Sequence, residues 1–181
     1  MGYPKVAYVG SCALVAIVKD NKLYVANAGD SKGVLLRRKD DDTFEYIKVS
    51  KTFNANKTYE QERLKNQFKK EDDIVVCKRD DYKACYVKGN LMPTRAFGDL
   101  RLKHSEFNFH NHPPELGYRK PIPTYNGPYI THEPEITVID LQKNDQYLIL
   151  ASDGLWDEIS RKKSAELVKS NETDLKKVAG T

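Results

Sequence analysis

No segment of this sequence is both apolar enough and long enough to cross a bilayer. The uncharged run at residues 6–18 has 13 residues, whereas a membrane-spanning helix needs about 20. We also recognise no secretory or transit segment. We therefore expect no membrane association, and we interpret residues 6–18 as a buried β-strand.

Cysteine is scarce, since the chain contains only Cys12, Cys77 and Cys85. The number is odd, and no pair has the spacing of a metal site. Cys12 lies in an apolar run and is expected to be a small core residue. This cysteine usage indicates a reducing, intracellular compartment.

A glycine-rich phosphate loop and a serine nucleophile elbow are both missing, so neither of those catalytic designs is indicated. The sequence also has no basic stripe, because 30 basic and 26 acidic residues leave a net charge of +4. The basic run at residues 37–39 is followed directly by three aspartates at residues 40–42. A nucleic-acid-binding surface usually concentrates basic residues with few acids beside them. We therefore expect no nucleic-acid partner.

What the sequence does contain is a succession of short apolar segments separated by polar turns. Its 181 residues suffice for one domain, and we expect a single domain over residues 1–181. Helices interrupt the strands without alternating with them, which favours an α+β fold with layered antiparallel sheets. Strands are predicted at residues 9–18, 23–28, 33–36, 44–49, 74–77, 84–87, 135–140 and 146–152.

Helices are predicted at residues 58–70 and 162–169. Asn56 or Thr58 is expected to cap the first of them. Residues 104–128 contain five prolines and are predicted to form a long surface loop, because each proline removes a backbone donor and restricts its predecessor. His110 and His112 lie in this loop, and we interpret both as surface residues.

Two aspartates stand at the ends of apolar strands. Asp30 follows the strand at residues 23–28, and Asp153 follows the strand at residues 146–152, each beside a glycine. A strand end holds a carboxylate rigidly, and oxygen ligands of this kind suit Mg²⁺ or Mn²⁺. An aspartate beside a glycine is also a common turn signal, so composition leaves both roles open. Arg95 and Asp99 could likewise form an ion pair or face a phosphate.

Three segments, taken in order, resemble motifs of the metal-dependent serine/threonine protein phosphatases of type 2C. Residues 26–32 are similar to the Gly-Asp-Ser-Arg motif, with Lys32 in place of the arginine. Residues 91–99 resemble the Ser-Arg-x-x-Gly-Asp motif, and residues 151–157 resemble Asp-Gly-[Leu/Ile]-Trp-[Asp/Glu]. Residues 53–65, 91–93 and 128–135 are similar to the pyruvate dehydrogenase phosphatase branch of this family.

The resemblance implies a sandwich of two antiparallel sheets flanked by helices and hydrolysis of phosphoserine and phosphothreonine in proteins. Two Mg²⁺ or Mn²⁺ ions would activate the attacking water, with a third, weaker ion nearby. Asp153 matches a ligand of the metal pair, and Asp30 matches a ligand of the third ion. Residues 54–78 match a flap beside the active site. The substrate would be a phosphoprotein, and the enzyme is expected to be a monomer.

The family's Asp-Gly-His-Gly segment, its phosphate-binding arginine and its C-terminal metal aspartate have no counterpart in this sequence. We therefore predict a partial catalytic domain that is inactive, or nearly so, by itself. A non-catalytic pseudophosphatase or scaffold is the alternative, and Lys32 is a point in its favour. A binding module that docks through residues 104–128 is a further one. The pyruvate dehydrogenase phosphatase resemblance suggests the mitochondrial matrix, although no transit peptide supports it.

Overall fold

The computed structural model describes residues 4–78, 84–108 and 121–174. Its internal contacts divide the chain into two compact units. Unit 1 consists of Met1–Ala13, Ala28–Asp30 and Thr52–Pro134, and unit 2 of Leu14–Asn27, Ser31–Lys51 and Glu135–Thr181. Each unit is described below by itself, and the interpretation of residues 1–181 as one partial domain stays a prediction.

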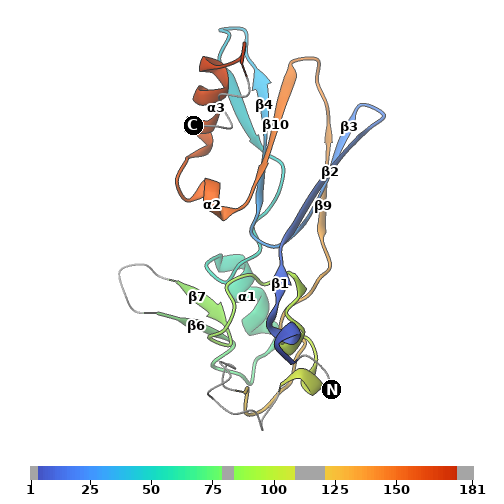
Figure 1. Cartoon of the computed structure of the whole chain (residues 1–181), viewed down its shortest axis with the longest axis vertical. Coiled ribbons are helices and arrows are strands. Elements are labelled where there is room, and N and C mark those ends of the chain that lie inside the picture. The colour runs from blue at the N-terminus through green and yellow to red at the C-terminus, as the bar shows by residue number, and fades with distance from the viewer. Residues whose placement is uncertain (1–3, 79–83, 109–120, 175–181) are drawn as a thin grey trace. The chain divides into compact units, whose positions relative to one another are not determined.

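Unit 2 begins with a hairpin. Strands β2 (Ala13–Lys19) and β3 (Lys22–Ala28) are joined by Asp20 and Asn21, both in the left-handed conformation with φ of 49° and 58°. Two successive residues with positive φ give the turn that matches the twist of a hairpin. Strand β9 (Glu135–Asp140) pairs antiparallel with β3, so the sheet order is β2-β3-β9 (Figure 1).

A second antiparallel sheet has the order β10-β4-β5, built from β4 (Lys32–Arg38), β5 (Phe44–Lys48) and β10 (Asp145–Ala151). One apolar cluster takes residues from both sheets, which makes unit 2 a sandwich and confirms the predicted fold class. The buried members of this cluster are Leu23, Val25, Leu35 and Val49, and the partly buried ones are Leu14, Ala16, Ile47, Ile139, Leu141 and Leu148.

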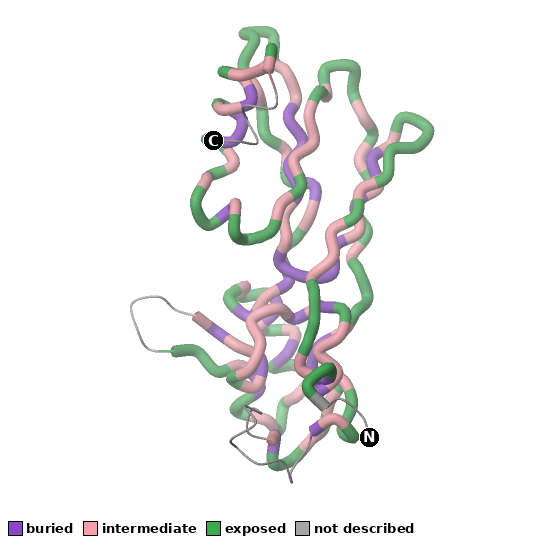
Figure 2. Tube along the Cα trace, viewed as in Figure 1, coloured by how far each residue is buried: buried purple, intermediate pink, exposed green. Residues whose placement is uncertain are grey.

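Helices α2 (Asp153–Trp156) and α3 (Arg161–Ser170) cover the other face of the β10-β4-β5 sheet. Alternate residues of β4 therefore enter different layers, with Leu35 facing the second sheet and Val34 and Leu36 facing the helices. This accounts for the continuous burial of residues 33–36 in the centre of β4 (Figure 2). Ser160 begins α3 by accepting a hydrogen bond from the backbone N–H of Lys163.

The prediction that residues 6–18 form a buried strand is wrong. Most of its large apolar side chains are exposed, including Val15 at 52% and Ile17 at 58%. The segment is divided between a short 3₁₀ helix (Pro4–Tyr8), β1 (Gly10–Ser11) and β2. Since β2 is an edge strand with one face on the core, only alternate residues are covered. The continuous apolar run in the sequence did not indicate that only one face of β2 is covered.

Unit 1 has less regular structure. Strand β1 pairs with β8 (Phe97–Gly98), and β6 (Val75–Cys77) pairs with β7 (Cys85–Val87). Its described residues also form helix α1 (Thr58–Gln67) and the 3₁₀ helices Pro4–Tyr8, Leu100–Leu102 and Ser105–Phe107. One hydrophobic cluster in this unit has the buried members Ala55, Leu64, Ile74, Cys85, Val87, Ala96, Leu102, Ile122, Tyr129 and Ile130.

The N-cap of α1 differs from the prediction. The capping position is Lys57, which makes no side-chain cap hydrogen bond. The side chain of Asn56 instead accepts from the backbone N–H of Cys85 at 2.7 Å and donates to the sulfur of Met92 at 3.5 Å. Asn56 is therefore engaged by β7 and the following turn, which are distant in sequence, and it is not available to the helix.

The proline-rich segment is described only at its two ends, and Pro113, Pro114, His110 and His112 lie outside the described residues. The described ends are not simply a surface loop. Asn108 is 4% exposed and exchanges two hydrogen bonds with the backbone of Ile122, at 2.7 and 2.8 Å. The 3₁₀ helix Ser105–Phe107 also forms within this segment, where no regular element was expected.

A disulfide joins Cys77 of β6 to Cys85 of β7. The sequence had indicated a reducing compartment, in which free thiols are the rule. The pairing depends on the hairpin register, which places these two residues opposite one another. Cysteine spacing alone does not predict this register.

Within the described residues, no helix has the length and apolar character needed to span a membrane.

Candidate metal centre

Asp30 lies directly after β3 and Gly29, in unit 1. The residue is 8% exposed, and its Oδ1 accepts a hydrogen bond from the thiol of Cys12 at 3.2 Å. Cys12 is thus partly buried beside a carboxylate, and it is not simply the small core residue that was expected. The contact fixes one oxygen of Asp30 in a largely enclosed position.

Gly29 makes this arrangement sterically feasible. Its φ of +139° is rare for residues with a side chain, and a Cβ at this position would lie 2.3 Å from the sulfur of Cys12. Its carbonyl also accepts from the backbone N–H of Phe53 at 2.9 Å. The glycine of the Gly-Asp-Ser-Lys motif therefore has a local structural role: it lets the chain turn tightly enough to seat Asp30 against Cys12.

Asp153 lies in unit 2, at the first position of α2, one residue beyond the extended Ser152 that follows β10. Its side chain is exposed. Ala151, the last residue of β10, pairs with Lys32, the first residue of β4. The end of a central strand pair thus supports the turn that carries Asp153.

Trp156 fixes this turn to the sheet. It is 8% exposed and packs with Val34 and Leu36, and its indole Nε1–H donates to the carbonyls of Lys32 at 3.0 Å and Ala151 at 3.1 Å. Both acceptors belong to the last pair of the β10–β4 ladder. The tryptophan of the Asp-Gly-Leu-Trp-Asp motif therefore holds in place the short helix on which Asp153 stands.

Replacing Trp156 by phenylalanine should lower the free energy of unfolding by about 1–2 kcal/mol, because two part-buried carbonyls lose their shared donor while most of the packing remains. Urea denaturation followed by circular dichroism measures this, since the substitution removes the only tryptophan. Tyr46→Phe, at a side chain that is 44% exposed, should change stability by less than about 0.5 kcal/mol. Equal stabilities for the Trp156→Phe variant and the unmodified chain would contradict the anchoring role.

The segment that resembles Ser-Arg-x-x-Gly-Asp lies within unit 1. The guanidinium of Arg95 stacks on the ring of Phe53 at 3.9 Å and donates to the carbonyl of Glu133 at 2.9 Å. Gly98 has a φ of +68°, and a Cβ there would lie 2.3 Å from the carbonyl oxygen of Val9. Asp99 follows in the left-handed conformation, with its backbone N–H bonded to the same carbonyl. These contacts give Arg95 and Gly98 structural roles.

A buried carboxylate that the sequence did not single out lies beneath this segment. Glu60 of α1 is 2% exposed, and it accepts hydrogen bonds from Arg63 at 2.8 Å and from the hydroxyl of the fully buried Thr94. Burial acts to raise the pKa of Glu60, but the bonds from Arg63 and Thr94 outweigh it and hold this pKa below its usual value. The sequence did offer one signal for this ion pair, because Glu60 and Arg63 are three residues apart in a predicted helix and so lie on the same helix face.

The described residues do not by themselves fit a divalent metal. Among the parts of the chain that the structure describes, no three histidine, cysteine, aspartate or glutamate side chains are grouped closely enough to hold one. Asp30 belongs to unit 1 and Asp153 to unit 2. Mg²⁺ and Mn²⁺ favour several oxygen ligands each, so this donor set is incomplete.

The sequence matches the family model of protein phosphatase 2C over residues 3–180. It is 38% identical over 169 residues to the Arabidopsis thaliana protein named "Probable protein phosphatase 2C 79", covering 93% of this chain and 42% of that protein. It is 37% identical over 173 residues to the mitochondrial pyruvate dehydrogenase (acetyl-transferring) phosphatase 1 of Bos taurus, covering 91% of this chain and 31% of that protein. The chain thus spans less than half the length of these relatives.

Solved structures show the same fold. A serine-threonine phosphatase 2C from Toxoplasma gondii superposes with a TM-score of 0.67 at 16% identity, covering 93% of this chain and 49% of that one. A sex-determining protein of C. elegans gives a TM-score of 0.59 at 20% identity, covering 88% and 31%. The sandwich of unit 2, the three motifs in order and the match over nearly the whole sequence agree: the chain belongs to the protein phosphatase 2C family.

Proposed function

We propose that this chain is the central part of a metal-dependent protein serine/threonine phosphatase. The observation that carries the proposal is the family match over residues 3–180. It is supported by the placement of Asp153 on a turn that Trp156 anchors to the β10–β4 ladder. A rigid, solvent-exposed carboxylate at a strand end is suited to binding a hard cation.

The proposed metal residues are Asp153, as a ligand of the catalytic pair, and Asp30, as a ligand of a third ion. Members of this family generally depend on Mg²⁺ or Mn²⁺, which would activate water for attack on phosphorus. Because the donor set of the described residues is incomplete, no step of the reaction is assigned to this chain alone. Its contribution is to hold Asp153 on the sheet and to enclose Asp30 beside Cys12.

The proposed substrates are phosphoproteins, and the protein is proposed to act as an intracellular monomer without nucleic-acid or membrane partners. The similarity to mitochondrial pyruvate dehydrogenase phosphatases of Bos taurus and Homo sapiens, at 37% and 36% identity, suggests the mitochondrial matrix. The plant relatives, at similar identity, carry no compartment in their names. Imaging of the tagged full-length protein against a matrix marker tests that location.

Mn²⁺-dependent hydrolysis of a phosphothreonine peptide tests the function. The 181-residue chain should be compared with an extended protein, by which we mean the parent polypeptide continued at both ends. Only the extended protein should turn over, because the chain alone lacks most of the metal ligands. Activity of the isolated chain at the level of the extended protein would show that the ligand set proposed here is wrong.

The same experiment separates the phosphatase from its alternative. An extended protein that folds and restores the missing metal motifs, yet remains inert with Mg²⁺ and Mn²⁺, would be a pseudophosphatase or scaffold. Lys32, which stands where the family motif has arginine, is the feature that favours this outcome. Its backbone carbonyl accepts from Trp156, a contact that either side chain at position 32 allows.

A further inference from the structure

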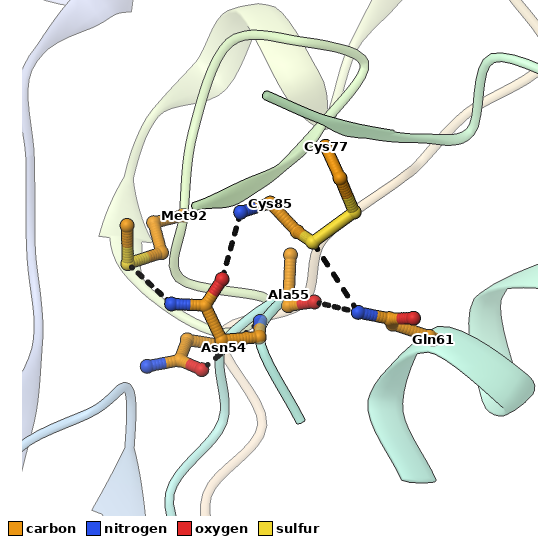
Figure 3. Close-up of a disulfide and its surroundings, with 7 residues drawn as sticks. Asn54, Ala55, Gln61, Cys77, Cys85 and Met92 are labelled. Atoms are coloured by element: carbon orange, nitrogen blue, oxygen red, sulfur yellow. Dashed lines mark hydrogen bonds between the residues drawn. A yellow bond between two sulfur atoms is a disulfide. The ribbon is translucent and has the colours of Figure 1, made fainter. Parts of the chain in front are cut away.

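The disulfide of the β6–β7 hairpin links two directly opposed residues. Cys77 and Cys85 are register partners. The next pair toward the turn is hydrogen-bonded, since the backbone N–H of Lys78 donates to the carbonyl of Ala84 at 2.9 Å. Because hydrogen-bonded and non-hydrogen-bonded pairs alternate along an antiparallel ladder, the cysteines occupy a non-hydrogen-bonded position, where facing side chains lie closest. Figure 3 shows the bond and its surroundings.

The two halves of this disulfide differ in exposure. Cys77 is an exposed residue near the end of β6. Cys85 is 4% exposed and belongs to the apolar core of unit 1. Exchange with an external thiol requires the attacking thiolate to reach one sulfur, and access decides which sulfur is attacked. The geometry therefore directs attack to Cys77 and makes Cys85 the leaving sulfur.

Burial of Cys85 in the apolar core acts against its departure as a thiolate, and a hydrogen-bond donor beside its sulfur offsets part of this cost. The side-chain amide of Gln61, in α1, donates toward the sulfur of Cys85 at 3.5 Å and is held in place by a bond of 2.7 Å to the carbonyl of Ala55 (Figure 3). Asn56 accepts from the backbone N–H of Cys85 at 2.7 Å. A donor aimed at a sulfur stabilises its anionic form, and a better-stabilised thiolate leaves faster.

The hairpin has other contacts that hold it together without the disulfide. The backbone N–H of Lys88 donates to the carbonyl of Ile74 at 3.0 Å, and its buried ammonium forms ion pairs with Glu71 and Asp73. The disulfide closes a short loop, with a sequence separation of 8, and short loops gain less from cross-linking than long ones. Reduction therefore leaves β6 and β7 paired and exposes a thiol at Cys77.

We propose that Cys77 and Cys85 form a reversible thiol–disulfide exchange site whose co-reactant is an external dithiol of the thioredoxin type. The thiolate of that dithiol attacks the sulfur of Cys77, the bond between the two cysteines breaks, and Cys85 leaves as a thiolate that takes up a proton. The second thiol of the dithiol then attacks the external sulfur of this mixed disulfide, and Cys77 leaves as a thiolate that takes up the proton the attacking thiol releases. Two electrons pass to the protein, and the products are an external disulfide and two cysteine thiols.

This proposal is independent of the proposed phosphatase activity. It agrees with the cysteine usage of the sequence, because disulfides in reducing compartments are mostly transient or redox-sensing. Cys12 takes no part, since its sulfur lies against Asp30.

The first test uses the folded 181-residue chain. Peptide mass spectrometry measures the oxidation state of Cys77 and Cys85 and distinguishes them from Cys12. Oxidised glutathione should link Cys77 to Cys85, dithiothreitol should reduce the bond without denaturant, and the cycle should repeat without loss of folded protein. A disulfide that dithiothreitol reduces only after the chain is unfolded would be a purely structural bond, and this result would overturn the proposal. Thiols that stay unlinked in oxidised glutathione would overturn it equally.

The second test separates the two sulfurs. In Cys85→Ser, the remaining Cys77 should react with oxidised glutathione at least about 10-fold faster than the remaining Cys85 does in Cys77→Ser, because access limits the buried thiol. Equal rates, or faster reaction of Cys85, would contradict the assigned direction of attack. Circular dichroism of both variants checks that each is folded.

Gln61 provides a third test, as a positioning residue for the leaving sulfur. Gln61→Leu should slow reduction of the disulfide by dithiothreitol by about 3- to 10-fold, since the donor to Cys85 is lost. Gln67→Leu, an exposed position on the same helix, should leave the rate unchanged. An unchanged rate in Gln61→Leu would remove Gln61 from the exchange site.

Discussion

In the extended protein, Asp153→Asn should lower kcat/KM for a phosphothreonine peptide by at least about 100-fold. Asparagine keeps the size and turn preference of aspartate but removes the negative charge that a divalent ion needs from its ligand. The turn itself should survive, because Trp156 and not Asp153 makes the described bonds to the ends of β4 and β10. The loss is therefore expected in metal binding and turnover, and not in folding.

Thermal denaturation with and without Mn²⁺ supplies the second readout for this variant. A ligand that binds only the folded state raises its melting temperature, so Mn²⁺ should stabilise the unmodified extended protein more than the Asp153→Asn variant. Asp140→Asn is the control, because its side chain is 82% exposed and forms a surface ion pair with Lys22. An Asp153→Asn variant with activity within about 5-fold of the parent would exclude the proposed ligand role.

Much of the fold could be predicted because local patterns coincide with tertiary burial. The hairpin of β2 and β3 follows from two apolar segments around Asp20 and Asn21, and both residues adopt the positive φ that such a turn requires. Strand β9 has the predicted bounds. The two candidate aspartates stand within two residues of the ends of β3 and β10, so a strand pattern and a glycine were enough to locate them.

The errors arise where the outcome depends on a distant partner. Whether Val15 or Ile17 is covered depends on what packs against β2, which a continuous apolar run does not encode. Asn56 could equally cap α1, and it bonds Cys85 only because β7 passes beside it. The Cys77–Cys85 bond requires the register of a hairpin. In each case the local residue type was compatible with two roles, and tertiary contacts selected one.

Replacing Glu60 by alanine should lower the free energy of unfolding by about 2–4 kcal/mol, toward the lower part of the range for breaking a buried pair, because Arg63 keeps some access to water. The side chain of Glu60 is 3% exposed and that of Arg63 is 35% exposed. Alanine leaves the hydroxyl of Thr94, itself 0% exposed, without its acceptor. The control is Glu62→Ala, at an exposed glutamate of the same helix, which should change the free energy of unfolding by less than about 0.5 kcal/mol.

The pH dependence of Glu60 distinguishes its charge from its packing. The pKa of Glu60 in the folded chain lies below the usual 4.5. Its ionised form therefore contributes its full stabilisation at pH values well above 4.5. The contribution is lost as the pH falls from 4.5 through the lower folded pKa. Glu60→Gln removes this charge and keeps an acceptor for Thr94. Urea denaturation should therefore show the largest stability difference between parent and variant near pH 7, and a shrinking difference below pH 4.5. A difference that stays constant with pH would mean that the carboxylate acts through its shape and not through its charge.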